Sequence, residues 1–251
     1  EFIEGRADAS RTMIVIAHRG DSGRAPESTA AAIRAALAAK ADMIELDVQM
    51  TPDRRLVIFH DDRLNRTTNG HGLVVHRRYQ DLLRLDAGSW FGPRFAGERI
   101  LLVSQALRLI RPPCRINLEL KRTRRPDALI RGVVRCLRWT RTAHRVLISS
   151  CDASLLARLR ARAPHVARAL LCRRRPGPAL RQAIRVGCVA FHPHRSLVTP
   201  ALIERAHAAG LRVHVWVVDR PAVARRLLRM GVDGLFTNVP AVLRSAAEAG
   251  G

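Results

Sequence analysis

Short apolar, β-branched runs alternate with Ala-, Leu- and Arg-rich helical stretches along the whole chain. This alternation predicts βα units around a parallel sheet, because a chain needs a helical crossover between parallel strands. Only seven residues separate the runs 43–48 and 56–60, so the second is expected to return as an antiparallel hairpin strand. The predicted strands are 13–18, 43–48, 56–60, 115–120, 145–149, 166–171, 187–191, 212–217 and 232–236.

Eight parallel strands with helices between them, in a chain of 251 residues, favour a closed (β/α)8 TIM barrel over an open doubly wound sheet. A dinucleotide-binding sheet would have a glycine fingerprint after its first strand, where this chain reads His18-Arg19-Gly20-Asp21-Ser22-Gly23. We expect one barrel domain over 13–251. A small inserted lobe is expected at about 61–102, since this is the one long connection without strand periodicity.

The first residues are expected to lie outside the domain. Residues 1–12 are interpreted as an expression-tag remnant and leader, because Ile3-Glu4-Gly5-Arg6 is a common protease-removal site. No signal-peptide pattern follows, which favours a cytoplasmic location. No apolar run approaches the length of about 18 residues that a membrane span needs. The five cysteines are widely spaced and form no CxxC pair, which favours a reducing compartment over a disulfide framework or a structural zinc.

The charge balance is strongly basic and uneven. Of the 44 basic residues 42 are arginines, and the net charge of +23 divides into +4 for 1–121 and +19 for 122–251. Such a field is typical of proteins that bind nucleic acid or an anionic membrane. We favour solvated helix faces instead, because the arginines are scattered and lack interleaved aromatic residues that could stack on bases. We therefore expect no nucleic-acid partner and no stable membrane insertion.

Polar side chains gather where several predicted strands end, which is where barrel enzymes have their active sites. Side chains alternate along a strand, so Glu45 and Asp47 point to the same face of their strand. Glu119 and Lys121 repeat this arrangement on a later strand. Any one of these residues alone is more often structural, and the pair His60-Asp61 is the least distinctive. Seven on one rim argue against coincidence: His18, Arg19, Glu45, Asp47, His60, Glu119 and Lys121.

These residue types together describe one kind of chemistry. The carboxylates of Glu45, Asp47 and Glu119 would repel one another in an apolar barrel unless a hard divalent cation lay between them. Oxygen ligands favour Mg²⁺ or Ca²⁺ over zinc. The cations Arg19 and Lys121 suit a phosphate group, and the two histidines suit proton transfer to and from its ester oxygens. Metal-assisted phosphodiester cleavage is the predicted reaction.

Short motifs along the chain extend this interpretation. They are His18-Arg19-Gly20, Pro26-Glu27-Ser28-Thr29, Ile44-Glu45-Leu46-Asp47-Val48, Val57-Ile58-Phe59-His60-Asp61, Arg66-Thr67-Thr68-Asn69-Gly70, Leu118-Glu119-Leu120-Lys121 and Gly231-Val232-Asp233-Gly234-Leu235-Phe236-Thr237-Asn238. In this order they resemble the bacterial glycerophosphodiester phosphodiesterase family, from about residue 13 to 243. The resemblance implies a TIM barrel with a lobe at 61–102. It also implies an acid/base pair (His18 and His60), metal ligands (Glu45, Asp47 and Glu119) and phosphate contacts (Arg19 and Lys121).

The resemblance further implies the reaction. Glycerophosphodiesters such as glycerophosphocholine and glycerophosphoethanolamine would be hydrolysed to sn-glycerol 3-phosphate and an alcohol. One histidine would deprotonate the attacking hydroxyl and the other would protonate the leaving alkoxide; the sequence does not assign the two roles, nor choose between water and the substrate's own 2-hydroxyl as attacking group. One alternative is a lysophospholipase D, which needs an apolar groove for an acyl chain. Another is a nucleic-acid or membrane-surface binding protein, against which the intact rim argues.

A few positions depart from the family's usual pattern. Ser28 replaces the usual Asn, Val217 and Asp219 replace frequent Thr and Asn, and Asn238 replaces Asp. None of these changes removes a residue assigned to the chemistry. Trp216, at the end of its predicted strand, is a candidate apolar wall against the substrate, with barrel packing as an equal alternative.

Overall fold

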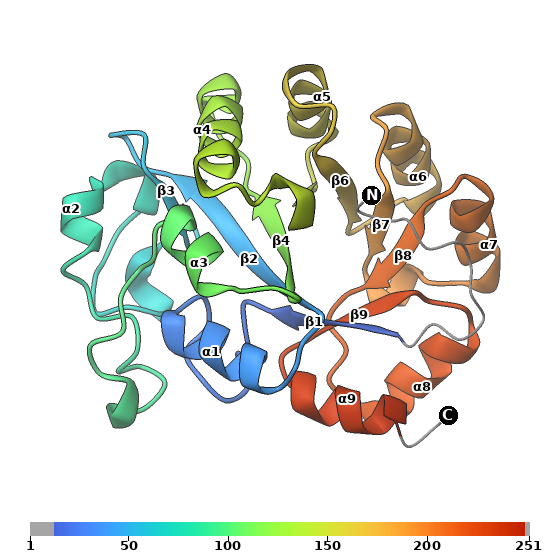
Figure 1. The fold of residues 1–251 in the computed structure, drawn as a ribbon, viewed down its shortest axis with the longest axis horizontal. Helices are drawn as coiled ribbons and strands as arrows, with labels where there is room; N and C mark the ends of the chain where they lie inside the picture. Colours follow the sequence, from blue (N-terminus) through green and yellow to red (C-terminus); the bar gives the residue numbers. More distant parts are fainter. Residues whose placement is uncertain (1–12, 249–251) are drawn as a thin grey trace.

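A closed ring of parallel strands forms the centre of the computed structural model, which describes residues 13–248 (Figure 1). The hydrogen-bonded order is β1-β9-β8-β7-β6-β5-β4-β2, and pairing of β1 with β2 closes the ring. The predicted (β/α)8 barrel is therefore confirmed, while the predicted tag remnant at 1–12 lies outside the described residues. The barrel strands are β1 (Ile14–His18), β2 (Met43–Met50), β4 (Arg115–Leu120), β5 (Val146–Ser150), β6 (Ala167–Cys172), β7 (Ala190–Pro193), β8 (Arg212–Val215) and β9 (Gly234–Thr237).

The remaining strand, β3 (Leu56–Ile58), is the antiparallel return that the short 43–60 spacing predicts. It pairs with the end of β2, where Val48 lies opposite Ile58. β3 ends at Ile58, two residues before the expected end at 60, because the backbone after it bends around the side chain of Gln49. The Gln49 amide donates hydrogen bonds to the carbonyl oxygens of Phe59, at 3.1 Å, and Asp61, at 2.7 Å. This fixes the backbone on both sides of His60.

Alternation along the strands separates two faces. Val15, Ala17, Ile44 and Leu46 belong to the main core, in which the strands pack against the surrounding helices. The intervening residues face the barrel interior and form a smaller cluster that includes Ile16, Met43, Ala169 and Phe236. Since Glu45 and Asp47 share the face of Met43, they must point into the barrel toward its carboxyl end.

The helices cover the outside of the ring (Figure 1). Their starts follow sequence signals: the Thr29 hydroxyl accepts a hydrogen bond from Ala32 N at 3.4 Å, Asp152 and Thr199 cap two others, and prolines begin five. The helices are α1 (Ala30–Ala38), α2 (Tyr79–Leu82), α3 (Val103–Leu109), α4 (Pro126–Thr140), α5 (Ala153–Arg162), α6 (Pro176–Arg185), α7 (Pro200–Ala208), α8 (Pro221–Arg229) and α9 (Pro240–Glu248). Within 13–248, none has the length and apolar composition needed to cross a bilayer.

Between β3 and α3 the chain forms an extended excursion on one side of the barrel, next to β3 (Figure 1). It contains only α2 and the short 3-10 turns Leu64–Arg66, Val74–His76 and Pro93–Phe95. A separate apolar cluster, which includes Phe59, Leu64, Val74 and Ile100, lies beneath it. Hydrogen bonds from three backbone N–H groups to the Asp86 carboxylate, at 2.6 to 2.8 Å, hold its far end. Hydrogen bonds to Asp86 therefore stabilise this part of the excursion in addition to the apolar cluster.

Candidate active site

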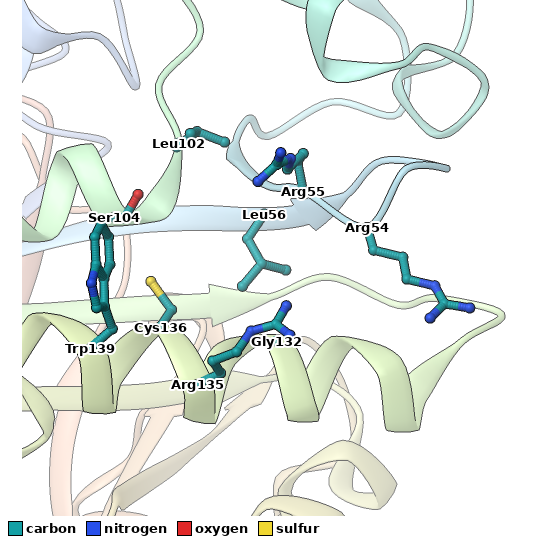
Figure 2. A pocket seen from close by; sticks show the side chains of 9 residues that line it. All are labelled: Arg54, Arg55, Leu56, Leu102, Ser104, Gly132, Arg135, Cys136 and Trp139. Carbon is teal, nitrogen blue, oxygen red and sulfur yellow. The ribbon is translucent and has the colours of Figure 1, made fainter.

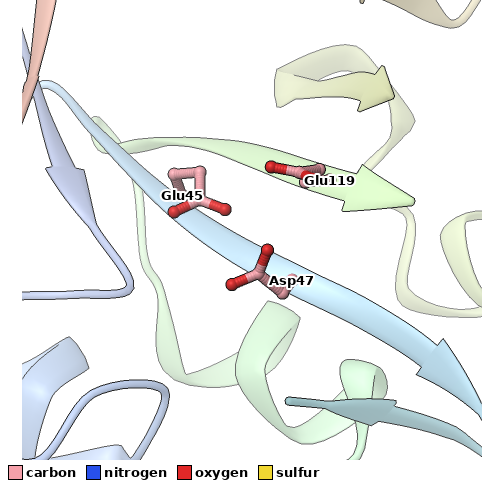
Figure 3. Close-up of side chains that lie close together, drawn as sticks. All are labelled: Glu45, Asp47 and Glu119. Atoms are coloured by element: carbon pink, nitrogen blue, oxygen red, sulfur yellow. The ribbon is translucent and has the colours of Figure 1, made fainter. Parts of the chain in front are cut away.

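Three carboxylates meet inside the carboxyl end of the barrel (Figure 3). Glu45 and Asp47 come from β2 and Glu119 from β4, and one oxygen of each lies within 4.8 Å of the other two. Parallel pairing places Asp47 opposite Glu119, which brings the two strands' acidic residues side by side. All three side chains are buried. The cluster is therefore a compact, desolvated set of oxygen ligands.

Two cations lie against this cluster. Lys121 Nζ is 2.6 Å from Asp47 Oδ1 and 2.8 Å from Glu119 Oε1. Arg19 Nε is 3.3 Å from Asp47 Oδ2, and the Arg19 backbone N–H donates to Glu45 Oε2 at 3.0 Å. Burial alone would raise the pKa of Asp47, but Lys121 and Arg19 hold it below its usual value. Asp47 is thus the carboxylate whose charge is best compensated.

The negative charge of the other two carboxyls is less well compensated than that of Asp47. Burial, followed by repulsion from Asp47, raises the pKa of both Glu45 and Glu119. Glu45 Oε1 is buried without a hydrogen-bond partner among the described residues. A buried, unpartnered carboxylate oxygen beside two like charges is strongly unfavourable unless a cation shares the site. The residues present therefore fit a hard divalent cation bound by oxygen atoms.

His18 lies at the end of β1 on the interior face. Its Nδ1 is 2.8 Å from Asn238 Oδ1, and the amide of Asn238 is itself oriented by Asp219. Asp219 Oδ2 accepts a hydrogen bond from Asn238 Nδ2 at 2.8 Å, and Asp219 Oδ1 accepts one from the Asn238 backbone N–H at 2.7 Å. Because a carboxylate oxygen only accepts, Oδ1 of the amide must face His18. His18 Nδ1 is therefore the protonated nitrogen, which leaves a lone pair on Nε2.

The charge state of His18 agrees with this tautomer. Burial, with a smaller effect of the adjacent Arg19 guanidinium, lowers the pKa of His18 to about 4. The imidazole is thus neutral near neutral pH and can accept a proton at Nε2. Ser22 Oγ also donates to Asn238 Oδ1, at 2.9 Å, which stabilises the same amide orientation.

His60 has a different partner. Its Nδ1 lies 2.6 Å from Asp61 Oδ1, so this imidazole is oriented by a carboxylate rather than an amide. Hydrogen bonding from Arg66, together with that from His60, lowers the pKa of Asp61 to about 2. Asp61 therefore carries a negative charge and accepts a hydrogen bond that orients the His60 ring.

A single arginine from the excursion after β3 connects both halves of the rim. Arg66 Nη1 and Nη2 donate to the two Glu27 oxygens, each at 2.7 Å, and Arg66 Nε donates to Asp61 Oδ2 at 2.6 Å. Glu27 Oε1 also accepts from Arg19 Nη1 at 2.8 Å. The orientations of Arg19 and His60 are thus both linked to Arg66.

Trp216 follows β8 and is half-buried. Its indole N–H donates to the His192 carbonyl oxygen at 2.8 Å, and its ring lies edge-on to His194, with centroids 4.8 Å apart. The Arg173 guanidinium lies 5.5 Å from the ring centroid. Trp216 therefore combines packing against the barrel with an exposed edge, and its contact with substrate stays a prediction.

The structure gathers Glu45, Asp47, Glu119, Lys121 and Arg19 in direct contact or within one cluster. The two histidines have partners of their own on the same rim, and their roles stay predictions. The partners that strand-end reasoning did not assign are Glu27, Asp61, Arg66, Asp219 and Asn238. Four of these five lie in the motifs quoted for the resemblance, which is the signal that could have identified them.

The fold and this acidic, cation-flanked rim define a barrel enzyme of the phosphoric diester hydrolase class. Comparison with known proteins places it more narrowly: residues 18–242 match the model of the glycerophosphoryl diester phosphodiesterase family. The chain therefore belongs to this family and is an enzyme of that kind, as the sequence resemblance predicts.

Relatives that are named as glycerophosphodiester phosphodiesterases align with this chain over nearly its full length. A glycerophosphodiester phosphodiesterase of Caldanaerobacter subterraneus subsp. tengcongensis is 36% identical over 243 residues, covering 95% of this chain and 99% of that protein. One from Bacillus altitudinis is 35% identical, covering 90% and 94%. Among solved structures, an Oleispira antarctica phosphodiesterase in complex with the product sn-glycerol-3-phosphate superposes with a TM-score of 0.88 at 32% identity, covering 94% of this chain and 97% of that chain.

Proposed function

We propose that the enzyme hydrolyses glycerophosphodiesters, such as glycerophosphocholine and glycerophosphoethanolamine, to sn-glycerol 3-phosphate and a free alcohol. The observation that carries this proposal is the buried cluster of Glu45, Asp47 and Glu119 beside the cations Lys121 and Arg19. An anionic phosphodiester fits between such cations. The product complex of the Oleispira antarctica relative supports the same substrate class.

Glu45, Asp47 and Glu119 would hold one Mg²⁺ or Ca²⁺, because their oxygens are close together, buried and partly unpartnered. When bound, such an ion supplies Lewis-acid polarisation of the phosphoryl group. Lys121 and Arg19 would then orient the non-bridging phosphate oxygens. Both side chains are mostly buried, with 17% and 15% exposed, so their charges act in a medium that screens them weakly.

His18 is the proposed general base. The chain from Asp219 through Asn238 fixes a proton on His18 Nδ1, and burial favours the neutral imidazole. Nε2 can therefore remove the proton of the attacking hydroxyl. An amide partner stabilises a charged imidazole only weakly, which suits a group that must be neutral before the reaction.

His60 is the proposed general acid. The Asp61 carboxylate accepts a hydrogen bond from its Nδ1 and orients the ring, and Arg66 holds that carboxylate in place. The proton on Nε2 would pass to the leaving alkoxide. In this proposal His18, whose partner is the amide of Asn238, accepts a proton, and His60, whose partner is the carboxylate of Asp61, donates one.

The deciding experiment is a phosphodiesterase assay on glycerophosphocholine and on lysophosphatidylcholine, with and without a chelator. We expect chelator-sensitive release of choline from glycerophosphocholine. His18→Ala and His60→Ala should each lower kcat about 10²-fold or more with the fold retained. Preferential turnover of lysophosphatidylcholine would instead support the lysophospholipase D alternative, and near-wild-type kcat in either variant would remove that histidine from catalysis.

A further inference from the structure

A groove unrelated to the candidate active site lies on the outer side of the barrel (Figure 2). It has a volume of about 330 Å³ and lies between the turn joining β2 to β3, the start of α3, and α4. Leu56 and Leu102 give it an apolar floor, and Gly132 of α4 lines it beside Leu56. None of its lining residues belongs to the catalytic rim.

A second hollow, of about 760 Å³, continues from the groove toward α5. Arg135 and Trp139 of α4 line both hollows and form the ridge between them. Trp139 has 61% of its surface exposed, the largest fraction among the exposed large apolar side chains of the described residues. Arg108 from α3 lies over its ring, 4.1 Å from the centroid. An ordered, largely exposed indole therefore stands at the centre of this surface.

The charge of this surface is of one sign. Among the residues that the structure describes, its two hollows are lined by six arginines and by no Asp or Glu: Arg54, Arg55, Arg131, Arg135, Arg138 and Arg162. All six are exposed. Within the part of the chain that the structure describes, none of their guanidinium groups has an ion pair or hydrogen bond, unlike Arg158 on the same side, which pairs with Asp127 at 2.7 Å. This surface is therefore a concentrated positive field without internal compensation.

From this combination we infer that the arginine–tryptophan surface docks the enzyme peripherally on an anionic phospholipid bilayer. An indole ring prefers the level of the lipid headgroups, where its apolar body and polar N–H are both solvated. Arginines around it attract the negative headgroups, each with a free energy sufficient for about a fivefold change in binding.

A single-stranded nucleic acid is a poorer fit to the same surface. Such binders place several aromatic rings in a row, so that successive bases can stack. Trp139 is the only aromatic residue that lines either hollow within 13–248, and Arg108 already covers one face of its ring. Docking on a bilayer is also independent of the proposed reaction, since no residue is shared between the two sites.

The test is co-sedimentation of the full chain with vesicles of phosphatidylglycerol and phosphatidylcholine, compared with vesicles of phosphatidylcholine alone. We expect salt-sensitive binding to the anionic vesicles only. Arg135→Gln/Arg138→Gln should weaken it about 25-fold. The matched control Arg225→Gln/Arg229→Gln removes the same charge from exposed positions on α8, across the barrel (Figure 1), and should weaken it less than about threefold.

Tryptophan emission gives a second, local measurement. Anionic vesicles should shift the emission to shorter wavelength in the wild type but not in Trp139→Phe. Equal weakening by both arginine pairs would overturn the proposal in favour of net charge alone, and tighter binding to single-stranded DNA through the same arginines would overturn it in favour of nucleic acid. Hydrolysis of glycerophosphocholine in free solution should be unchanged in every variant, so failure of docking and failure of the proposed function are distinguishable.

Discussion

Asp219 does not touch a reacting group in the proposed mechanism, yet Asp219→Asn should strongly lower kcat. In the wild type, Asp219 accepts hydrogen bonds from the side chain and the backbone of Asn238. An Asn at position 219 keeps an oxygen for the backbone N–H but presents an NH₂ group to the Asn238 amide. The Asn238 amide should therefore rotate by about 180°, so that its NH₂ faces His18 and the proton of His18 moves to Nε2. Nε2 is then no longer a base.

The size of the effect follows from the hydrogen bonds involved. To recover the productive tautomer, the variant must place the NH₂ group of Asn238 opposite the NH₂ group of the new Asn at position 219. One N–H donor of each amide is then left unpaired. Position 219 is exposed and Asn238 is half-buried, so water can reach the donor at position 219, while the donor left unpaired on Asn238 costs about 1–3 kcal/mol. The productive form therefore lies about 2 kcal/mol above the rotated one. Catalysis through this minor form lowers kcat about 30-fold, since each 1.4 kcal/mol corresponds to about a factor of ten. KM for glycerophosphocholine should change little.

The assay is steady-state hydrolysis of glycerophosphocholine, with ¹⁵N NMR of the His18 ring as a direct measure of the tautomer. The exchanged variant Asp219→Asn/Asn238→Asp is the control, because the new amide then donates to the new carboxylate, which again accepts from His18 Nδ1. It should recover most of kcat at alkaline pH, where His18 is neutral although its new carboxylate partner favours the charged imidazole. Wild-type turnover in Asp219→Asn, or loss in the exchanged variant as large as in the single one with both proteins folded, would refute the reasoning about the His18 tautomer.

Other expectations concern the metal, the phosphate contact and the excursion after β3. Chelation should abolish hydrolysis and Mg²⁺ or Ca²⁺ should restore it, while Glu45→Gln should lower metal content by elemental analysis; full activity in a metal-free sample would contradict this. Lys121→Met should lower kcat and raise KM with metal content unchanged, and a rise in KM alone would limit Lys121 to substrate binding. Backbone N–H groups, those of Ser89 and Gly97 first, lower the pKa of Asp86, so its stabilisation is present above its ordinary pKa of about 4 and is lost as the pH falls. Asp86→Asn should therefore reduce the free energy of unfolding by about 1 kcal/mol at neutral pH, a difference that denaturant titrations should find shrinking below about pH 4.

Much of the fold could be predicted because βα periodicity is strong. The predicted strands coincide with the observed ones to within three residues, and the 43–60 spacing alone identified the antiparallel return. The largest shift is at β7, which was expected from 187 and begins at Ala190. Gly187 has a φ of +68°, which belongs to a turn and not to a strand. The apolar run at 187–191 therefore begins inside this turn, and the extended backbone of β7 starts only after it.

The site was predictable where strand alternation decides which way a side chain points. It placed Glu45 with Asp47 and Glu119 with Lys121 without any knowledge of distances. Alternation says nothing of partners brought together across the ring, such as His18 and Asn238, which are 220 residues apart. Nor could it show that the Lys121 ammonium lies between two carboxylates. Those contacts depend on barrel closure and on loop conformation, which no local pattern specifies.

Arg66 connects the excursion after β3 to the catalytic rim by hydrogen bonds. Its guanidinium holds Glu27, which positions Arg19 near the proposed phosphate site, and it holds Asp61, which orients His60. A displacement of this one side chain would disturb the proposed phosphate contact and the proposed proton donor together, while leaving the carboxylate cluster of β2 and β4 intact. Substitutions that move Arg66 therefore act on both proposed roles at once, so this excursion is a control point of the rim and not only a cover for it.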